Sequence, residues 1–565
     1  MEPLSPPSQP EEEWHLGVDP EALDHDAFAD APPAIDPSAD RLEKPVAVLT
    51  VEHLAWILIA SWTLLTRFAF LGARPLNASE ARDALFAYDL ASRTDEAAAA
   101  GFHPFAAGWI HLAQAGIFAL GGANDLTARL FFVLSGMLLL AMTFELRHYI
   151  GRAGAIGMGA LLALSPTVTW FSRANAIAIT GAALAIVAIA VFMALCAQPT
   201  RRRAAALGLA SGLLIASGPT GCILAASLIG SLALCGIGAF FVTGNAWLRA
   251  RVWLDRYRRL VLVVVVTALV FCFASQHAVG LPLRGLADSF AILAAPRIAN
   301  FVPGLRALLL PLAFYEFMIA LATLAGIVVV CALRVRARFA RFTAIWTVLS
   351  FVLYLSLPDP DPERILVVLL PAAILGGIAL DYFHHTHYWR YGRYLIAVIA
   401  LLTIFVQLAI NFIHSSPDAS AAAWSRHATL YWGQDATTIQ TRDQGNAILK
   451  QVEPANRTVY HDGGWPPALR WYLRDLRPIE SISDARVVVD TNQPSKLNLD
   501  PARTTQFDYV ESWIAVPASL NNRRALRFFF LQEPWSAITA HPVALEVRPQ
   551  GSGNAPTLIV PPSAP

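Results

Sequence analysis

The chain has 565 residues, of which 56% are hydrophobic and 15% are charged, and its formal net charge is +1. Its mean hydropathy of +0.49 excludes an ordinary water-soluble globular protein. The balanced charge gives no sign of a nucleic-acid partner. We therefore expect an integral multi-pass membrane protein, with the lipid bilayer of the plasma membrane as its surroundings.

An acidic and proline-rich segment occupies residues 1–46 and carries almost no bases. Such a composition cannot bury enough apolar area to fold alone. It also lacks the basic start and the early apolar core of a cleaved signal peptide. We expect a disordered cytoplasmic tail.

Residues 47–414 form the predicted transmembrane domain, because a helix needs about 20 apolar residues to cross the hydrocarbon core. Eleven spans are predicted, at 51–71, 126–149, 153–171, 177–197, 204–218, 221–242, 260–279, 307–333, 340–356, 365–383 and 394–413. Arginines gather in alternate loops, for example at residues 201–203 and 334–341. The positive-inside rule places those loops in the cytoplasm. The loop at 72–125 and the C-terminal residues are then extracytoplasmic.

Two extracytoplasmic parts have structure of their own. Residues 107–121 are too short to span, and we expect an amphipathic helix along the outer interface. Residues 415–565 are polar, with strand-like runs at 486–490 and 545–547 and a helical run at 447–451. The predicted fold is thus an α-helical polytopic membrane domain followed by an extracytoplasmic α/β domain.

The first outer loop carries the sequence from Arg74 to Asp83, Arg-Pro-Leu-Asn-Ala-Ser-Glu-Ala-Arg-Asp, in which Glu80 follows Ser79. Further short motifs follow in order along the chain: Gly-Phe-His-Pro-Phe at 101–105, a stretch at 118–130 that opens with Phe118 and contains Arg129, Ser-Pro to Ser-Arg at 165–173, Pro-Glu-Arg to Leu-Pro at 362–371, and Arg-Trp-Tyr-Leu-Arg-Asp at 470–475. In this order the motifs resemble the GT-C superfamily of membrane glycosyltransferases. The branch most similar is the protein-mannosyltransferase-like group, which includes flippase-associated bacterial and archaeal members.

This resemblance implies transfer of a sugar from a polyprenyl-phosphate-linked donor to an acceptor outside the cytoplasm. A carboxylate in the first loop serves there as general base, or holds a divalent metal ion. Arginines at the membrane edge neutralise the departing phosphate. The resemblance implies that Glu80 and Asp83 are the catalytic acids. The resemblance also gives five candidate substrate-binding residues: Arg82, His103, Arg173, Glu363 and Arg364. No resident metal site is predicted, and the acceptor, a protein, glycan or lipid, stays open.

The chain also departs from the family pattern. Ser79 stands where the family has an aspartate, and residues 174–178 contain no acid where the family has a second one. A capped helix start after Ser79 explains Glu80 and Asp83 without chemistry. Two alternatives therefore stay open: a non-catalytic homologue that binds lipid-linked glycans or a partner protein, and a transporter or flippase. The long first loop, the outer domain and the lack of visible repeats disfavour the transporter. Glu316 lies inside a predicted span, where a carboxylate is expensive, and its role is open.

Overall fold

The computed structural model describes residues 50–92, 107–243, 246–277, 284–293, 301–331, 338–357, 362–386, 389–408, 436–454, 457–462, 467–479, 481–490, 504–510 and 540–547. The chain divides into two units, residues 1–54 and residues 55–565. In the first unit, the backbone N–H of His53 donates to Thr50 Oγ1 over 3.3 Å, at the start of helix α1 (Val51–Phe68). The predicted tail at 1–46 lies outside the described residues.

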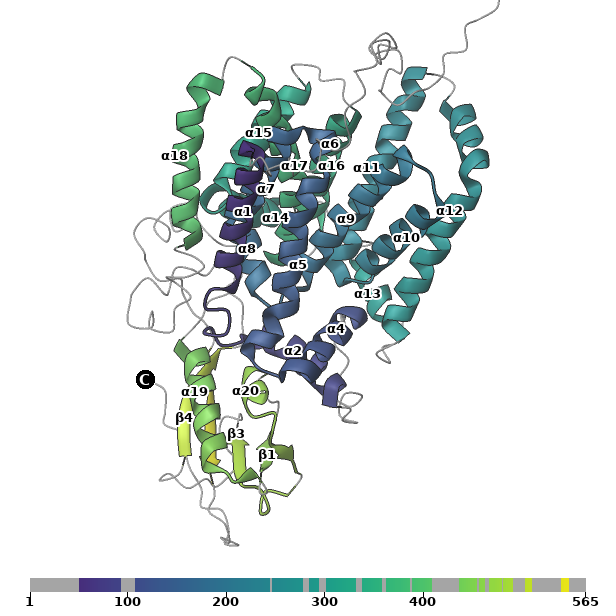
Figure 1. Cartoon of the computed structure of the whole chain (residues 1–565). Coiled ribbons are helices and arrows are strands. Elements are labelled where there is room, and N and C mark those ends of the chain that lie inside the picture. The colour runs from purple at the N-terminus through teal and green to yellow at the C-terminus, as the bar shows by residue number, and fades with distance from the viewer. Residues whose placement is uncertain are drawn as a thin grey trace, which may run out of the picture. The chain divides into compact units, whose positions relative to one another are not determined.

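Helices make up most of the described part of the second unit as far as Leu408 (Figure 1). After α1 and the first loop they are α5 (Asp125–Glu145), α6 (Arg147–Ile150), α7 (Arg152–Leu164), α8 (Pro166–Arg173), α9 (Ile177–Ala197), α10 (Arg201–Ile215), α11 (Gly218–Thr243), α12 (Ala246–His277), α13 (Arg284–Leu293), α14 (Phe301–Phe314), α15 (Phe317–Cys331), α16 (Arg338–Ser356), the 3₁₀ turn η5 (Pro362–Arg364), α17 (Ile365–His384) and α18 (Trp389–Leu408). Helix α17 packs against α7, α15 and α16, and it is the most deeply buried of the candidate spans.

The helices confirm an integral membrane protein of the predicted class. Among the described residues, six helices are long and apolar enough to cross a membrane, or seven if the bent pair α7 and α8 counts as one. Each of the eleven predicted spans overlaps one of the helices or a pair of them. Shorter apolar helices, such as Phe317–Cys331, account for part of the difference between these counts.

Two predicted spans are not continuous. The span at 153–171 bends by 61° between α7 and α8, where Ser165 and Pro166 interrupt the helix. The span at 307–333 breaks between α14 and α15, where the carbonyl of Pro311 accepts the N–H groups of both Tyr315 and Glu316. At the first break Pro166 lacks a backbone donor and starts a new helix, whereas Pro311 lies inside α14, four residues before the second break.

The predicted first outer loop, residues 72–125, contains helices α2 (Ala78–Ser92) and α4 (Gly108–Gly121). Helix α2 packs on α4, and α4 packs on the start of α5. Gln114 ties α4 to α5, because its Nε2 donates to the carbonyl of Ala128 over 2.8 Å. The helix predicted at 107–121 is therefore present, and its place at the membrane interface stays a prediction.

The C-terminal residues form the predicted α/β domain. Helices α19 (Ala436–Gln451) and α20 (Pro467–Tyr472) accompany a five-stranded sheet in the order β2-β1-β3-β5-β4. The strands are β1 (Thr458–Asp462), β2 (Arg477–Pro478), β3 (Val487–Asp490), β4 (Thr504–Val510) and β5 (Ala540–Val547). Strand β1 pairs in parallel with β2 and β3, whereas β5 runs antiparallel to both β3 and β4.

This domain shares a hydrophobic core with the first outer loop. Leu76 before α2 and Leu85 on α2 belong to the same buried cluster as Trp471 of α20 and Leu473 after it. Phe118 of α4 lies 5.8 Å from Trp471 between ring centroids. Figure 1 shows α20 beside α2. The two segments, almost 400 residues apart in sequence, therefore fold as one body.

Candidate functional site

Helix α2 begins with a capping box that uses Glu80. The side-chain oxygen of Asn77 accepts the backbone N–H of Glu80 over 2.9 Å, and Glu80 Oε2 accepts the N–H of Asn77 over 3.1 Å. This reciprocal pair satisfies two amides at the first turn of a helix. The cap is thus Asn77, two residues before the start that Ser79 suggested. Glu80 and Asp83 lie three residues apart on α2, so one helical turn separates them.

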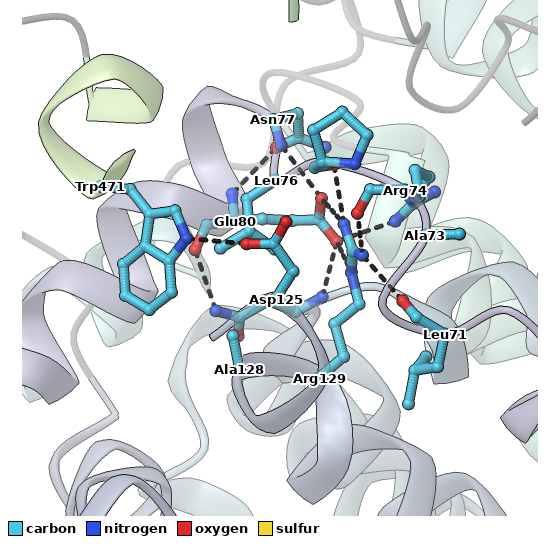
Figure 2. A network of polar contacts seen from close by, with 12 residues as sticks. Leu71, Ala73, Arg74, Leu76, Asn77, Glu80, Asp125, Ala128, Arg129 and Trp471 are labelled. Atoms are coloured by element: carbon cyan, nitrogen blue, oxygen red, sulfur yellow. Dashed lines mark hydrogen bonds and ion pairs between the residues drawn. The ribbon is translucent and has the colours of Figure 1, made fainter. Parts of the chain in front are cut away.

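The carboxylate of Glu80 is buried and fully engaged (Figure 2). Arg74 Nη2 donates to Oε1 over 2.8 Å, and Arg129 donates to Oε1 through Nε over 3.0 Å and to Oε2 through Nη2 over 2.9 Å. The backbone N–H of Asn175 donates to Oε1 over 3.1 Å, and Asn175 Nδ2 donates to the carbonyl of Glu80. Glu80 therefore joins α2, α5 and the turn between α8 and α9.

Arg129 also holds the backbone that leads into α2. Its Nη1 donates to the carbonyls of Leu71 over 3.0 Å and Arg74 over 2.5 Å, and its Nη2 donates to the carbonyl of Pro75 over 2.9 Å. The side chain is wholly buried. One guanidinium thus fixes both the carboxylate and the loop around it, which is a use of arginine's planar fork that lysine cannot copy.

The two acids of α2 ionise differently. Burial alone would raise the pKa of Glu80, but its ion pairs with Arg129 and Arg74 and its bond from Asn77 lower that pKa to about 2. Burial raises the pKa of Asp83 to about 7, with Glu80 adding to the shift and Arg82 opposing it. Glu80 is therefore a permanent anion at neutral pH, whereas Asp83 can take up and release a proton there.

Four buried arginines lie near one another at this site, and two of them pair with Glu80. They are Arg67 of α1, Arg74 of the loop, Arg129 of α5 and Arg173 of α8, and the last of these lies within electrostatic reach of the other three. Arg173 Nη1 donates to the carbonyls of Thr66 over 2.6 Å and Ala69 over 2.7 Å, at the end of α1. The four cations outnumber the two carboxylates that act on Arg129 and Arg74, namely Glu80 and Asp125.

Arg67 is the least compensated of the four. It is wholly buried, and its hydrogen bonds to Thr66 Oγ1 and to the carbonyl of Leu162 both measure 3.4 Å. Its Nε has no hydrogen-bond partner among the described residues. Arg74 differs, because its guanidinium stacks 4.4 Å over the ring of Trp170 while it pairs with Glu80. Buried cations in such surplus favour a bound anion.

Glu316 lies at the break between α14 and α15, and its side chain binds the break between α7 and α8. Its Oε1 accepts the Ser165 hydroxyl over 2.7 Å and the N–H of Thr167 over 2.8 Å, at the start of α8. A carboxylate at a helix N-terminus is favoured by the free amides there. Helix α8, which is buried along its length, carries Trp170 and Arg173 into the cluster.

Comparisons with known proteins identify the fold. No family model and no curated protein matches the sequence. Two crystal structures of ArnT from Cupriavidus metallidurans are similar to this chain, one bound to undecaprenyl phosphate and one in the apo state. The first is 17% identical with a TM-score of 0.56, and the match covers 89% of this chain and 99% of that one. The second is 17% identical with a TM-score of 0.54, and it covers 87% and 98%.

The chain has a GT-C-like fold. The ordered motifs of the sequence predicted this fold, and the prediction is confirmed. Within the GT-C-like fold, the carboxylate of the first loop and the Ser-Arg element after α7 do meet, because Asn175 joins the turn after Arg173 to Glu80. The catalytic role of Glu80 stays a prediction, although five donors now occupy its two oxygens.

The other predicted site residues lie in different surroundings. Arg82 is exposed on α2, and Asp83 is buried beside it. Glu363 and Arg364 are partly buried in η5, which contacts α9 and α17, and Arg364 is not among the partners of Glu80. His103 lies outside the described residues.

Sequence reasoning missed Arg74 and Arg129 as site residues. Arg129 lies one turn inside a predicted span, where an ionisable side chain is a functional candidate by default. Arg74 lies in the quoted loop motif itself, six residues before Glu80. Their meeting with Glu80 could not be read from spacing, since 49 residues separate Arg129 from Glu80.

Proposed function

We propose that this protein is a membrane glycosyltransferase that moves a sugar from a polyprenyl-phosphate-linked donor to an acceptor on the extracytoplasmic face. The observation that carries the proposal is the cluster of four buried arginines at this site, two of which pair with Glu80. A lipid phosphate, released when the sugar leaves, is an anion that such a cluster would stabilise. The likeness to ArnT bound to undecaprenyl phosphate supports the same donor class.

Arg74 and Arg173 are the proposed contacts to the phosphate. They retain 7% and 8% exposure, whereas Arg67 and Arg129 retain none. Each is held in place by a neighbour: Arg74 stacks on the ring of Trp170, and Arg173 donates to a carbonyl at the end of α1. The two wholly buried arginines contribute long-range positive potential in a medium that screens it weakly.

Asp83 is the proposed general base. Its carboxylate accepts the proton of the acceptor hydroxyl, the acceptor oxygen bonds to the anomeric carbon, and the bond from that carbon to the phosphate oxygen breaks. A base works best when its pKa lies near the working pH, which the pKa of about 7 satisfies. Glu80 positions the cations and cannot serve as a base while its oxygens are occupied.

A metal ion receives no step in this scheme. No group of three His, Cys, Asp or Glu side chains that could hold a metal exists among the described residues. Glu80, the acid that the family resemblance offered as a ligand, already accepts from Arg74, Arg129, Asn77 and Asn175. The side chains therefore do not fit a metal-bridged phosphate at this carboxylate.

The second candidate function is a non-catalytic subunit that binds lipid-linked glycans. Two features favour this candidate: the hydrogen bonds that occupy both oxygens of Glu80, and the serine at position 79. Each leaves the site with one carboxylate fewer that could act as a general base. The arginine cluster serves phosphate binding in either case. The two candidates differ in whether bound donor turns over.

The deciding experiment compares Asp83→Asn with the wild-type chain in nanodiscs. A panel of polyprenyl-phosphate hexoses supplies the donor, and membrane extracts supply the acceptor. We expect Asp83→Asn to lower the rate by about 10²-fold or more, the usual contribution of a general base. The wild-type rate should rise with pH through about 7, as Asp83 loses its proton.

Asp484→Asn is the matched control, since that carboxylate is exposed on the outer domain. It should leave the rate and its pH profile unchanged. Binding of undecaprenyl phosphate without turnover at any pH would select the non-catalytic subunit instead. Absence of both binding and turnover would refute the two candidates together.

A further inference from the structure

The loop before α2 is held from two sides. From the membrane domain, Arg129 binds the carbonyls of Leu71, Arg74 and Pro75. From the outer domain, Tyr472 accepts the backbone N–H of Leu76 over 2.8 Å, and Arg442 Nη1 donates to the carbonyl of Ala73 over 2.8 Å. The loop therefore takes part of its shape from residues that follow the last membrane helix.

The hydroxyl of Tyr472 is a junction between three segments. It accepts from Leu76 of the loop and donates to Asp125 Oδ2 over 3.1 Å at the start of α5. The adjacent Trp471 donates its indole N–H to the other oxygen of Asp125 over 2.8 Å (Figure 2). Both aromatic side chains are buried, Trp471 completely. A single oxygen thus links the outer domain, α5 and the loop.

The position of Leu76 explains why this junction matters to the site. Its neighbour Pro75 carries a carbonyl that binds Arg129, and its other neighbour Asn77 caps α2 and binds Glu80. Leu76 itself is wholly buried in the core shared with the outer domain. Movement of this one peptide would change the geometry of Arg74, Arg129 and Glu80 together.

We propose that Tyr472 is a positioning residue of the phosphate and sugar site, and that the outer domain sets the shape of the arginine cluster through its hydroxyl. This inference rests on the proposed function for its consequence in transfer. Its structural part stands on the contacts alone. The outer domain then acts as a fixed brace of the site, and its loss would change donor binding even though no outer-domain residue touches the donor in this scheme.

The test is Tyr472→Phe in the full-length chain in nanodiscs. The change removes the hydroxyl and leaves the ring in the core, so Leu76 N–H and Asp125 Oδ2 lose a partner. Tyr460→Phe is the matched control, because it removes a tyrosine hydroxyl from β1 of the same domain, away from the loop. Arg442→Gln is a second variant that removes the other brace without touching the core.

Hydrogen exchange of peptides that cover residues 71–77 is the first readout. We expect Tyr472→Phe and Arg442→Gln to speed exchange there by about fivefold or more, as for loss of one buried hydrogen bond, and Tyr460→Phe to leave it unchanged. The second readout is transfer, where Tyr472→Phe should raise the KM for donor several-fold and shift kcat less. A merely structural role would lower the active fraction and leave KM unchanged.

The outcomes separate this inference from the proposed function. Unchanged exchange at 71–77 in Tyr472→Phe overturns the inference, whatever the transfer rates are. Faster exchange at 71–77 combined with an unchanged KM for donor overturns the role of Tyr472 in positioning the donor site. Faster exchange in a chain whose wild type transfers no sugar to any acceptor refutes the proposed function, and the coupling between Tyr472 and the loop still stands.

Discussion

Replacing Glu80 by Gln should destabilise the protein far more than an ordinary surface change. The lowering of the Glu80 pKa from 4.5 to about 2 corresponds to roughly 3 kcal/mol at neutral pH, at about 1.4 kcal/mol per unit. Removing one partner of a buried ion pair costs about 3–5 kcal/mol by an independent route. The two figures agree. Gln would leave the buried cations Arg74 and Arg129 without the negative charge of Glu80.

Equilibrium unfolding of the full chain in mixed micelles measures this difference. Glu145→Gln is the control, since that carboxylate is exposed at the end of α5, and it should stay within about 0.5 kcal/mol of wild type. The pH dependence has a definite sign. A carboxyl whose folded pKa is lowered stabilises the fold above its unfolded pKa of 4.5, and this stabilisation is lost as the pH falls toward about 2.

The gap between wild type and Glu80→Gln should therefore be widest at neutral pH and narrow below pH 4.5. If Glu80→Gln unfolds with the wild-type free energy at pH 7, then the ion pairs do not organise the site as described. The proposed division of labour between Glu80 and Asp83 would fail with them.

Two further predictions concern how α8 is held. Gly136→Ala should cost about 1–3 kcal/mol in the same unfolding assay, because the new methyl would overlap the hydroxyl of Ser172, whereas Gly116→Ala meets nothing within 4 Å and should be neutral or stabilising. Glu316→Ala should lower the free energy of unfolding by about 2 kcal/mol or more, because it leaves two buried donors at the start of α8 without an acceptor. Glu316→Gln should lower it less, because the amide keeps one acceptor oxygen. Equal effects of the two Glu316 variants would contradict this role.

The sequence was sufficient to predict the fold class, because membrane helices can be recognised by their length and their apolar composition. It was less informative about breaks inside spans. Ser165-Pro166 is a good helix start as well as a span interruption, and the bend of 61° between α7 and α8 follows from that choice. Whether a proline in a span bends or breaks the helix depends on neighbours that can cap the freed groups, as Glu316 does here.

The candidate site was only partly predictable for a related reason. The capping signal at Asn77 and Glu80 is local and stands in the printed sequence, since Asn followed three residues later by Glu is a helix-start pattern. The contacts of Arg129 and Tyr472 are not local, and no spacing rule reaches them. Burial decides the ionisation of Asp83, and burial follows from the packing of α2 on α4 and α20.

Asp83 lies four residues after Ser79, the position at which the family resemblance expects an aspartate. Residues four apart on a helix are neighbours on one face, about 6 Å apart between their Cβ atoms, so Asp83 stands next to Ser79 on α2. An acid moved by one turn keeps access to the same side of the helix, while Glu80 retains its place among the arginines. In this arrangement a carboxylate that titrates near neutral pH lies beside a fixed ion-paired one. Two acids with such separated pKa values are the pattern expected of a base and its electrostatic support, which is why Asp83 decides between an enzyme and a binding subunit.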